Sequence, residues 1–142
     1  MRVIAATAQE IAGHTAGLTP DAADRAPAPG KWSAREIVCH LADTEIAFGF
    51  RLRQALAEPN HVIQPFDQDR WAERYSAYDL PSALELFTAI RRWNLLLITS
   101  LAQEDYARPL SHPERGAMTF RTLVETMGGH DLNHLAQLKS AV

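Results

Sequence analysis

The chain has 142 residues, a formal net charge of −3 and 46% hydrophobic residues, which fits one globular domain over residues 1–142. The 14 basic side chains do not outnumber the 17 acidic ones and form no run, so nucleic acid is not an expected partner. No apolar run approaches the roughly 18 residues of a membrane span, so a membrane is not expected either. The only cysteine, Cys39, excludes an internal disulfide and favours a reducing, cytoplasmic setting.

The spacing of apolar residues predicts a first helix over residues 3–18 and a longer second helix that begins after Ser33. Ser33 and Glu36 match a capping box, in which each side chain bonds the other residue's backbone N–H. Pro59 ends this helix because proline lacks that N–H. Residues 20–30, rich in Pro, Ala and Asp, are short enough to be a loop between the two helices.

Two further helices follow a predicted loop over residues 60–66 and a short helical turn over residues 67–75. Ser82 and Glu85 match a second capping box, just after Pro81. The apolar stripe expected to face the core in this helix is Leu86, Ile90, Trp93, Leu97 and Leu101. Two prolines and a glycine predict a loop over residues 103–118, and the last helix is predicted over residues 119–141.

No segment shows the alternating hydrophobicity of a strand. Four long amphipathic helices predict an all-α fold, a four-helix bundle of the antiparallel type. The connecting segments are longer than in the tightest bundles, so the pattern alone leaves the order of the helices open.

Three histidines are the clearest sign of chemistry in the chain. His130 and His134 are four residues apart and therefore share one helix face. Leu123, Met127 and Leu138 lie on the same face, which directs both imidazoles toward the interior of the bundle. His40, on the second helix, lies about 60° around from the apolar residue Ile37 and is placed to reach across to another helix.

Three neutral imidazoles satisfy a divalent metal ion and leave coordination positions open, as in catalytic rather than structural sites. A buried imidazole without a partner costs on the order of 1–3 kcal/mol, which a shared ion would offset. We therefore predict a metal site formed by His40, His130 and His134. The alternative is that these are ordinary core or surface histidines.

Two other metal motifs fit less well. Residues 130–134 are similar to the zinc-protease motif His-Glu-x-x-His, but Asp131 replaces the glutamate and no third ligand follows in the eight remaining residues. Di-iron bundles need a glutamate three residues before each ligand histidine, which neither His130 nor His134 has.

Several neighbours are candidates for supporting roles. Asp43, Asp131 and Gln137 are close in sequence to the histidines and are candidates to accept the far ring N–H of a ligand. Helix geometry turns Asp131 about 100° from His130 and places Asp43 on the outward side of His40, so the alternative for them is a solvated carboxylate.

Thr44, Phe48 and Met127 would line a substrate pocket beside the metal, unless they are plain core residues. His112 and Glu114 either overhang its opening or are simply solvated. Cys39 points about 100° away from His40, which makes it a poor fourth ligand and favours a buried apolar role.

Three short runs resemble the DinB-like family of helical proteins and its YfiT-like branch of metal-dependent hydrolases. They are Lys-Trp-Ser at 31–33, His-Leu-Ala-Asp-Thr-Glu at 40–45 and His-Asp-Leu-Asn-His-Leu-Ala-Gln-Leu at 130–138. The resemblance implies a four-helix bundle with up-down-down-up order and a homodimer. It also implies one divalent ion, nickel or zinc, held by His40, His130 and His134.

The same resemblance implies a function. Relatives include transferases that use low-molecular-weight thiols and a thiol-dependent isomerase. We expect a metal-dependent enzyme on a small molecule, a hydrolase or thiol transferase, whose ion activates water or a low-molecular-weight thiol. The alternative is a non-catalytic, metal-containing module that binds a small ligand or serves a stress response. A plain helical or dimerisation protein with incidental histidines is a third possibility.

Overall fold

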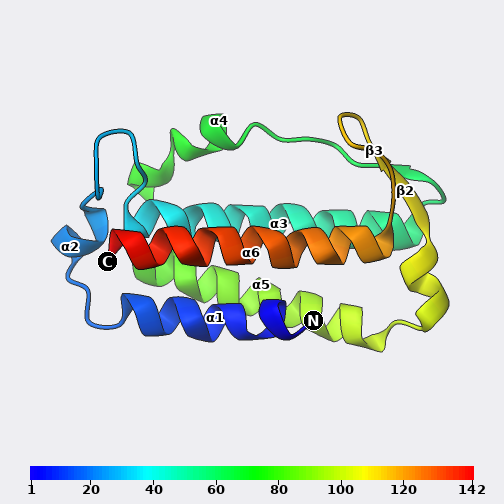
Figure 1. Ribbon diagram of the computed structural model, residues 1–142, viewed down its shortest axis with the longest axis horizontal. Helices are drawn as coiled ribbons and strands as arrows, with labels where there is room; N and C mark the ends of the chain where they lie inside the picture. The colour runs from blue at the N-terminus through cyan, green and yellow to red at the C-terminus, as the bar shows by residue number, and fades with distance from the viewer.

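Four long helices form the body of the molecule in the computed structural model, which describes residues 1–142. They are α1 (Arg2–Thr15), α3 (Ala34–Ala57), α5 (Leu80–Ser100) and α6 (Phe120–Ala141). In Figure 1, α1 and α6 run from right to left, whereas α3 and α5 run from left to right. The predicted helical bundle is confirmed. None of its helices combines the length and the hydropathy that a membrane span requires.

The connections carry short elements, of which the sequence pattern predicted only the helical turn at residues 67–75, seen as α4. They contain α2 (Pro20–Asp24), α4 (Gln68–Ala72), the 3₁₀ turns η1 (Tyr75–Ala77) and η2 (Gln103–Ala107), and the strands β1 (His61–Val62), β2 (Pro109–His112) and β3 (Gly116–Thr119). Strand β2 pairs parallel with β1 and antiparallel with β3. The expectation of no strands was therefore wrong, because strands of two to four residues are too short to show a clear alternation.

The start of α3 follows its predicted cap. The Ser33 N–H donates to Glu36 Oε2 at 2.8 Å, and the Glu36 N–H donates to Ser33 Oγ at 3.2 Å. The predicted start of α5, with Ser82 as its cap, was wrong by about one turn. The cap is Asp79, whose carboxylate accepts from the Ser82 N–H at 2.7 Å. Pro81 therefore lies in the first turn of α5, where a backbone N–H would have no hydrogen-bond partner within the helix, so proline costs nothing there.

The predicted core face of α5 was also wrong. Its buried residues are Ala83, Phe87, Arg91, Asn94 and Ile98. Leu86 and Trp93, expected to face the core, are 43% and 64% exposed. The helix is rotated relative to its apolar stripe because Arg91 and Asn94 take part in a buried polar network, described below.

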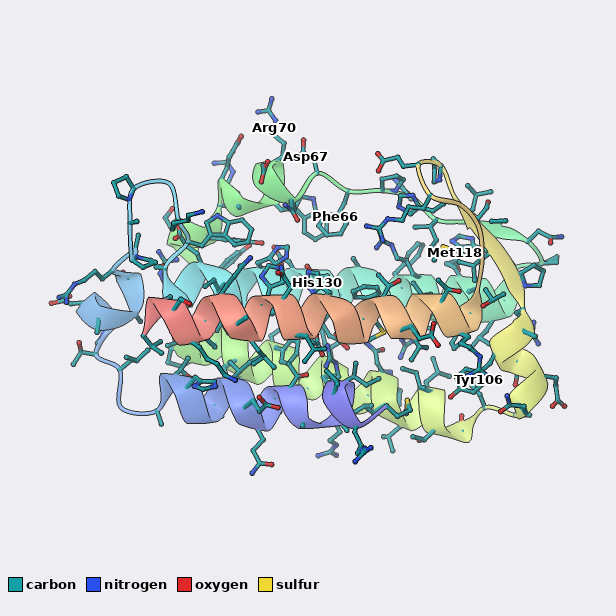
Figure 2. The ribbon with its side chains drawn as sticks, in the orientation of Figure 1. Phe66, Asp67, Arg70, Tyr106, Met118 and His130 are labelled. Atoms are coloured by element: carbon teal, nitrogen blue, oxygen red, sulfur yellow. The ribbon has the colours of Figure 1, made fainter.

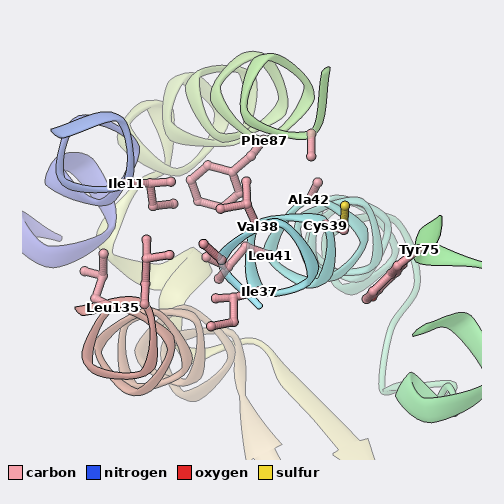
Figure 3. Packing of buried hydrophobic residues seen from close by; sticks show 12 residues of the cluster. Ile11, Ile37, Val38, Cys39, Leu41, Ala42, Tyr75, Phe87 and Leu135 are labelled. Carbon is pink, nitrogen blue, oxygen red and sulfur yellow. The ribbon is translucent and has the colours of Figure 1, made fainter. Parts of the chain in front are cut away.

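Apolar side chains from all four long helices meet in the centre of the bundle. Figure 3 shows Ile11 of α1, Phe87 of α5 and Leu135 of α6 converging on Val38 of α3, with Tyr75 on the opposite side of that helix. Burial of such side chains contributes roughly 1.5–3 kcal/mol each. This packing fixes α3 against α6, the two helices that carry the histidines.

Candidate metal centre

The three histidines predicted as ligands converge in the structure. His40, on α3, and His130 and His134, on α6, each offer a ring nitrogen, and these nitrogens lie within 4.8 Å of one another. The Nε2 atoms of His40 and His130 are 3.0 Å apart, although the residues are 90 positions apart in the chain. Two nitrogens bound tetrahedrally to one zinc ion at about 2.0–2.1 Å would be separated by about 3.3–3.4 Å, close to the spacing seen here.

Burial keeps the three imidazoles in the neutral form that can bind a cation. His40 and His134 are 1% and 7% exposed, and His130 is half-buried. Burial, with a smaller contribution from the neighbouring histidines, lowers the pKa of both His40 and His130 to about 3. Burial also lowers the pKa of His134. Three adjacent neutral nitrogen donors fit a divalent ion such as zinc or nickel.

Two residues of the site fix the orientation of the rings. Gln137 Oε1 lies 3.0 Å from His134 Nδ1, so it accepts that ring's proton and leaves Nε2 free. Trp32 stacks on His134, with ring centroids 6.3 Å apart and planes 16° apart, and its centroid is 4.9 Å from that of His40. These contacts hold the His134 ring in the orientation that brings its nitrogen to those of the other two histidines.

The structure does not bring the carboxylates of Asp131 and Asp43 to the imidazoles. Asp131 is 1% exposed and accepts from Arg91 at 2.5 and 3.0 Å and from Thr7 at 2.7 Å. Asp43 lines a separate depression with Cys39, where burial raises the pKa of its carboxyl. Cys39 is a free, buried core residue, as predicted, and burial raises its pKa to about 11.

Asp131 belongs to a buried polar network behind the histidines. Arg91 also donates to Glu45 Oε2 at 2.7 Å and to the Ile4 carbonyl at 2.9 Å. Asn94 donates to Glu45 Oε1 at 2.8 Å. The network joins all four long helices and constrains the rotation of α6, whose adjacent face presents His130 and His134.

A cavity of about 330 Å³ opens beside His40 and His130. Thr44 and Phe48, two of the three predicted pocket residues, line it, and Thr44 Oγ1 is 3.4 Å from His40 Nε2. The third, Met127, is fully buried in the core and does not line this cavity. His112 and Glu114 also line it.

The long connection between α3 and α5 covers this cavity. Figure 2 shows Phe66 of that connection and His130 of α6 on the same side of the bundle, with Met118 farther along. Phe66 and Met118 both line the cavity.

A second cavity, of about 800 Å³, reaches His130 and His134 from the end of the bundle where α6 finishes. It is lined by Trp32 and Gln137, and His130 and Gln68 line both cavities. The histidine trio is therefore accessible from two sides.

Sequence reasoning missed several residues of this region. Arg51 lines the first cavity. The sequence could have indicated this, because Arg51 follows His40 by eleven residues and therefore lies on the same face of that helix. Trp32 was noted only within the Lys-Trp-Ser run at 31–33 that carries the family resemblance. The ion pair of Arg91 with Glu45 was not predicted, because a buried ion pair between distant segments has no local pattern.

Three histidines that converge inside a helical bundle have the donor set of a metal centre. Comparison with known proteins shows which family the chain belongs to. The model of the DinB superfamily matches residues 4–138, so the chain belongs to that family. A protein of Oceanobacillus iheyensis named "Putative metal-dependent hydrolase" is 34% identical over 113 residues, which cover 78% of this chain and 65% of that protein. A protein of the same name from Bacillus cereus is 31% identical over 114 residues, with the same coverage.

The fold has a close match among solved structures. YfiT from Bacillus subtilis, a "probable metal-dependent hydrolase with an unusual four-helix bundle topology", superposes with a TM-score of 0.91 over 99% of this chain and 82% of that one, at 22% identity. The match shows a shared fold. The chain spans just under two thirds of the length of the curated relatives that it matches.

Proposed function

We propose that the protein is a metal-dependent hydrolase of a small molecule, with one divalent ion, zinc or nickel, bound by His40, His130 and His134. The observation that carries this proposal is the convergence of three neutral ring nitrogens within 4.8 Å beside an open cavity. The names of the relatives point to the same activity. A bound ion would lower the pKa of a coordinated water or thiol and supply a nucleophile near neutral pH.

The chain's own residues would orient the reaction. Gln137 holds the His134 ring through Nδ1, and Trp32 stacks on the same ring. Thr44 Oγ1, next to His40 Nε2, is placed to hydrogen-bond a nucleophile or a substrate oxygen. Phe48 and Phe66 would exclude water from the rest of the cavity.

A thiol transferase is the second candidate, and the second cavity favours it. Because His130 and His134 are reached from two sides, a low-molecular-weight thiol and an electrophile would each have a separate approach to the ion. A non-catalytic module for ligand binding or stress response is the third candidate. It is favoured by the absence of a carboxylate bonded to any of the three imidazoles.

Turnover assays separate the three candidates. Untagged protein, loaded with zinc or nickel or stripped with a chelator, would be assayed on panels of esters, amides and electrophiles, with and without thiols. Metal-dependent hydrolysis that is lost in His130→Ala supports the hydrolase, whereas turnover that needs a thiol supports the transferase. Metal binding without turnover supports the binding module, and failure to bind metal rejects all three.

We also propose that the protein is a homodimer in a reducing, cytoplasmic setting. The unpaired Cys39 is consistent with that setting. The dimer is supported by an exposed apolar groove between α1 and α5, where Trp93 and Leu96 are 64% and 56% exposed beside Ala5 and Ala8. A patch of this kind is typical of an interaction surface.

A further inference from the structure

Two arginines line the cavity beside the histidines without a carboxylate partner. Arg51 comes from α3, and Arg115 comes from the turn between β2 and β3. Neither takes part in any of the ion pairs of the structure. Other arginines of the chain, such as Arg35, Arg70 and Arg91, are paired with carboxylates.

Arg51 is held in place rather than free in solvent. Its Nη2 donates to the Gln64 carbonyl at 3.0 Å. Its Cζ lies 5.9 Å from the ring centre of Phe48 and 5.4 Å from that of Phe66, within the range of cation–π contacts. A guanidinium fixed in this way loses little conformational entropy when it binds an anion.

The two positive charges act on one another. Burial and the charge of Arg115 lower the pKa of Arg51. The only acidic residue that lines the cavity, Glu114, is exposed and forms no ion pair, so two arginines and one glutamate leave a surplus of one positive charge. A bound anion would relieve the repulsion between the guanidinium groups.

The position of Arg51 also bears on the shape of a ligand. His40, Thr44, Phe48 and Arg51 line the cavity along one face of α3. Eleven residues separate the first from the last, about 16 Å between their backbones at 1.5 Å per residue. An anionic group at Arg51 and a reacting group at the histidines would thus be at opposite ends of one extended molecule.

We propose that Arg51 and Arg115 form an anion-binding subsite for a carboxylate or phosphate group at the end of the substrate remote from the histidines. Calling the ligand a substrate rests on the proposed function, but the anion subsite itself does not require the metal. Guanidinium groups bind both kinds of anion through charge-assisted hydrogen bonds. The aromatic walls at Phe48 and Phe66 favour an apolar or aromatic middle section in the substrate.

The test compares charged and neutral probes of the same shape. The affinities of benzoate, phenylphosphonate and benzamide would be measured by NMR titration of the full chain, both metal-loaded and metal-stripped. We expect at least one anion to bind about tenfold more tightly than benzamide in both forms, as hydrogen bonds to charged groups allow. Arg51→Gln and Arg115→Gln should each reduce this preference, Glu114→Gln should increase it, and the exposed control Arg74→Gln should leave it unchanged.

Three results would overturn the proposal: equal affinity for anions and benzamide in the unsubstituted chain, a preference that survives the double variant Arg51→Gln/Arg115→Gln, or one that disappears when the metal is removed. The last would assign anion binding to the ion. Because the stripped protein is tested as well, the subsite is judged even if no metal binds. Arg115 lies on an exposed turn, so its variant reports on binding even if Arg51→Gln misfolds.

Discussion

Arg91 on α5 and Asp131 on α6 form a buried ion pair with two hydrogen bonds, of 2.5 and 3.0 Å, directly behind the candidate metal centre. Asp131 directly follows the ligand position His130 on α6, and its carboxylate bonds Arg91 and Thr7 inside the bundle rather than an imidazole. The pair fixes how α6 is rotated about its axis. The histidine geometry therefore depends on a network that touches none of the three rings.

Removal of Arg91 should strongly destabilise the fold. Arg91→Met leaves Asp131 and Glu45 buried without their shared partner, which typically costs about 3–5 kcal/mol. Urea unfolding monitored by circular dichroism measures this loss. The exposed Arg74 provides the control, since Arg74→Met should stay within about 0.5 kcal/mol of the unsubstituted protein. Equal effects of the two substitutions would contradict a structural role for the network.

Gln137 should matter for metal affinity rather than for folding. Gln137→Ala removes the acceptor of the His134 ring proton, and the loss of such a partner typically weakens metal binding about 10–100-fold. Competition with a chromophoric chelator measures the affinity. Gln137→Glu keeps an acceptor and should retain tight binding. Asn133→Ala, on the same exposed side of α6, should have no effect, and a loss of affinity there equal to that of Gln137→Ala would contradict this role.

The metal-free protein should lose stability in mild acid. The folded-state pKa of His40 and of His130 is about 3, whereas an unfolded histidine titrates near 6.5. As pH falls below 6.5 the unfolded chain takes up protons that the folded chain does not, so stability decreases from pH 6.5 toward pH 3. Urea midpoints between pH 7.5 and 5 measure the slope. The double variant His40→Gln/His130→Gln should flatten it, and an unchanged slope would argue against neutral buried imidazoles.

A substitution of Trp93 tests the proposed homodimer. Sedimentation velocity should show a dimer that Trp93→Glu converts to a monomer, because a charge in the groove between α1 and α5 would be buried without a partner. Trp71→Glu, which changes an exposed tryptophan on α4, should leave the dimer intact. A monomer in the unsubstituted protein would reject the homodimer, and a dimer that survives Trp93→Glu would place the interface elsewhere.

The sequence predicted those parts of the structure that depend on local patterns. The capping box at Ser33 fixed the start of α3, and the four-residue spacing placed His130 and His134 on one inward face of α6. The face of α5 could not be predicted in this way. A hydrophobicity pattern excludes Arg91 from the core, and only a tertiary partner such as Asp131 makes its burial favourable.

The rest of the site depended on segments that are distant in sequence. Arg51 and Arg115 meet at one cavity only because the connection after α3 and the hairpin before α6 cover the same part of the bundle. Strands as short as β1 owe their pairing to that packing and not to their own residues. The notable exception is the histidine trio, because metal ligation restricts the residue types strongly enough to be recognised without a fold.

X-ray absorption at the metal edge of zinc- or nickel-loaded protein tests the central claim most directly. We expect one ion per chain with the scattering of three imidazoles, at about 2.0–2.1 Å for zinc, and further light atoms from water. His40→Ala should remove one imidazole from that pattern, whereas Cys39→Ala should leave it unchanged. A sulfur shell, or an ion coordinated by fewer than three imidazoles, would contradict a centre formed by His40, His130 and His134.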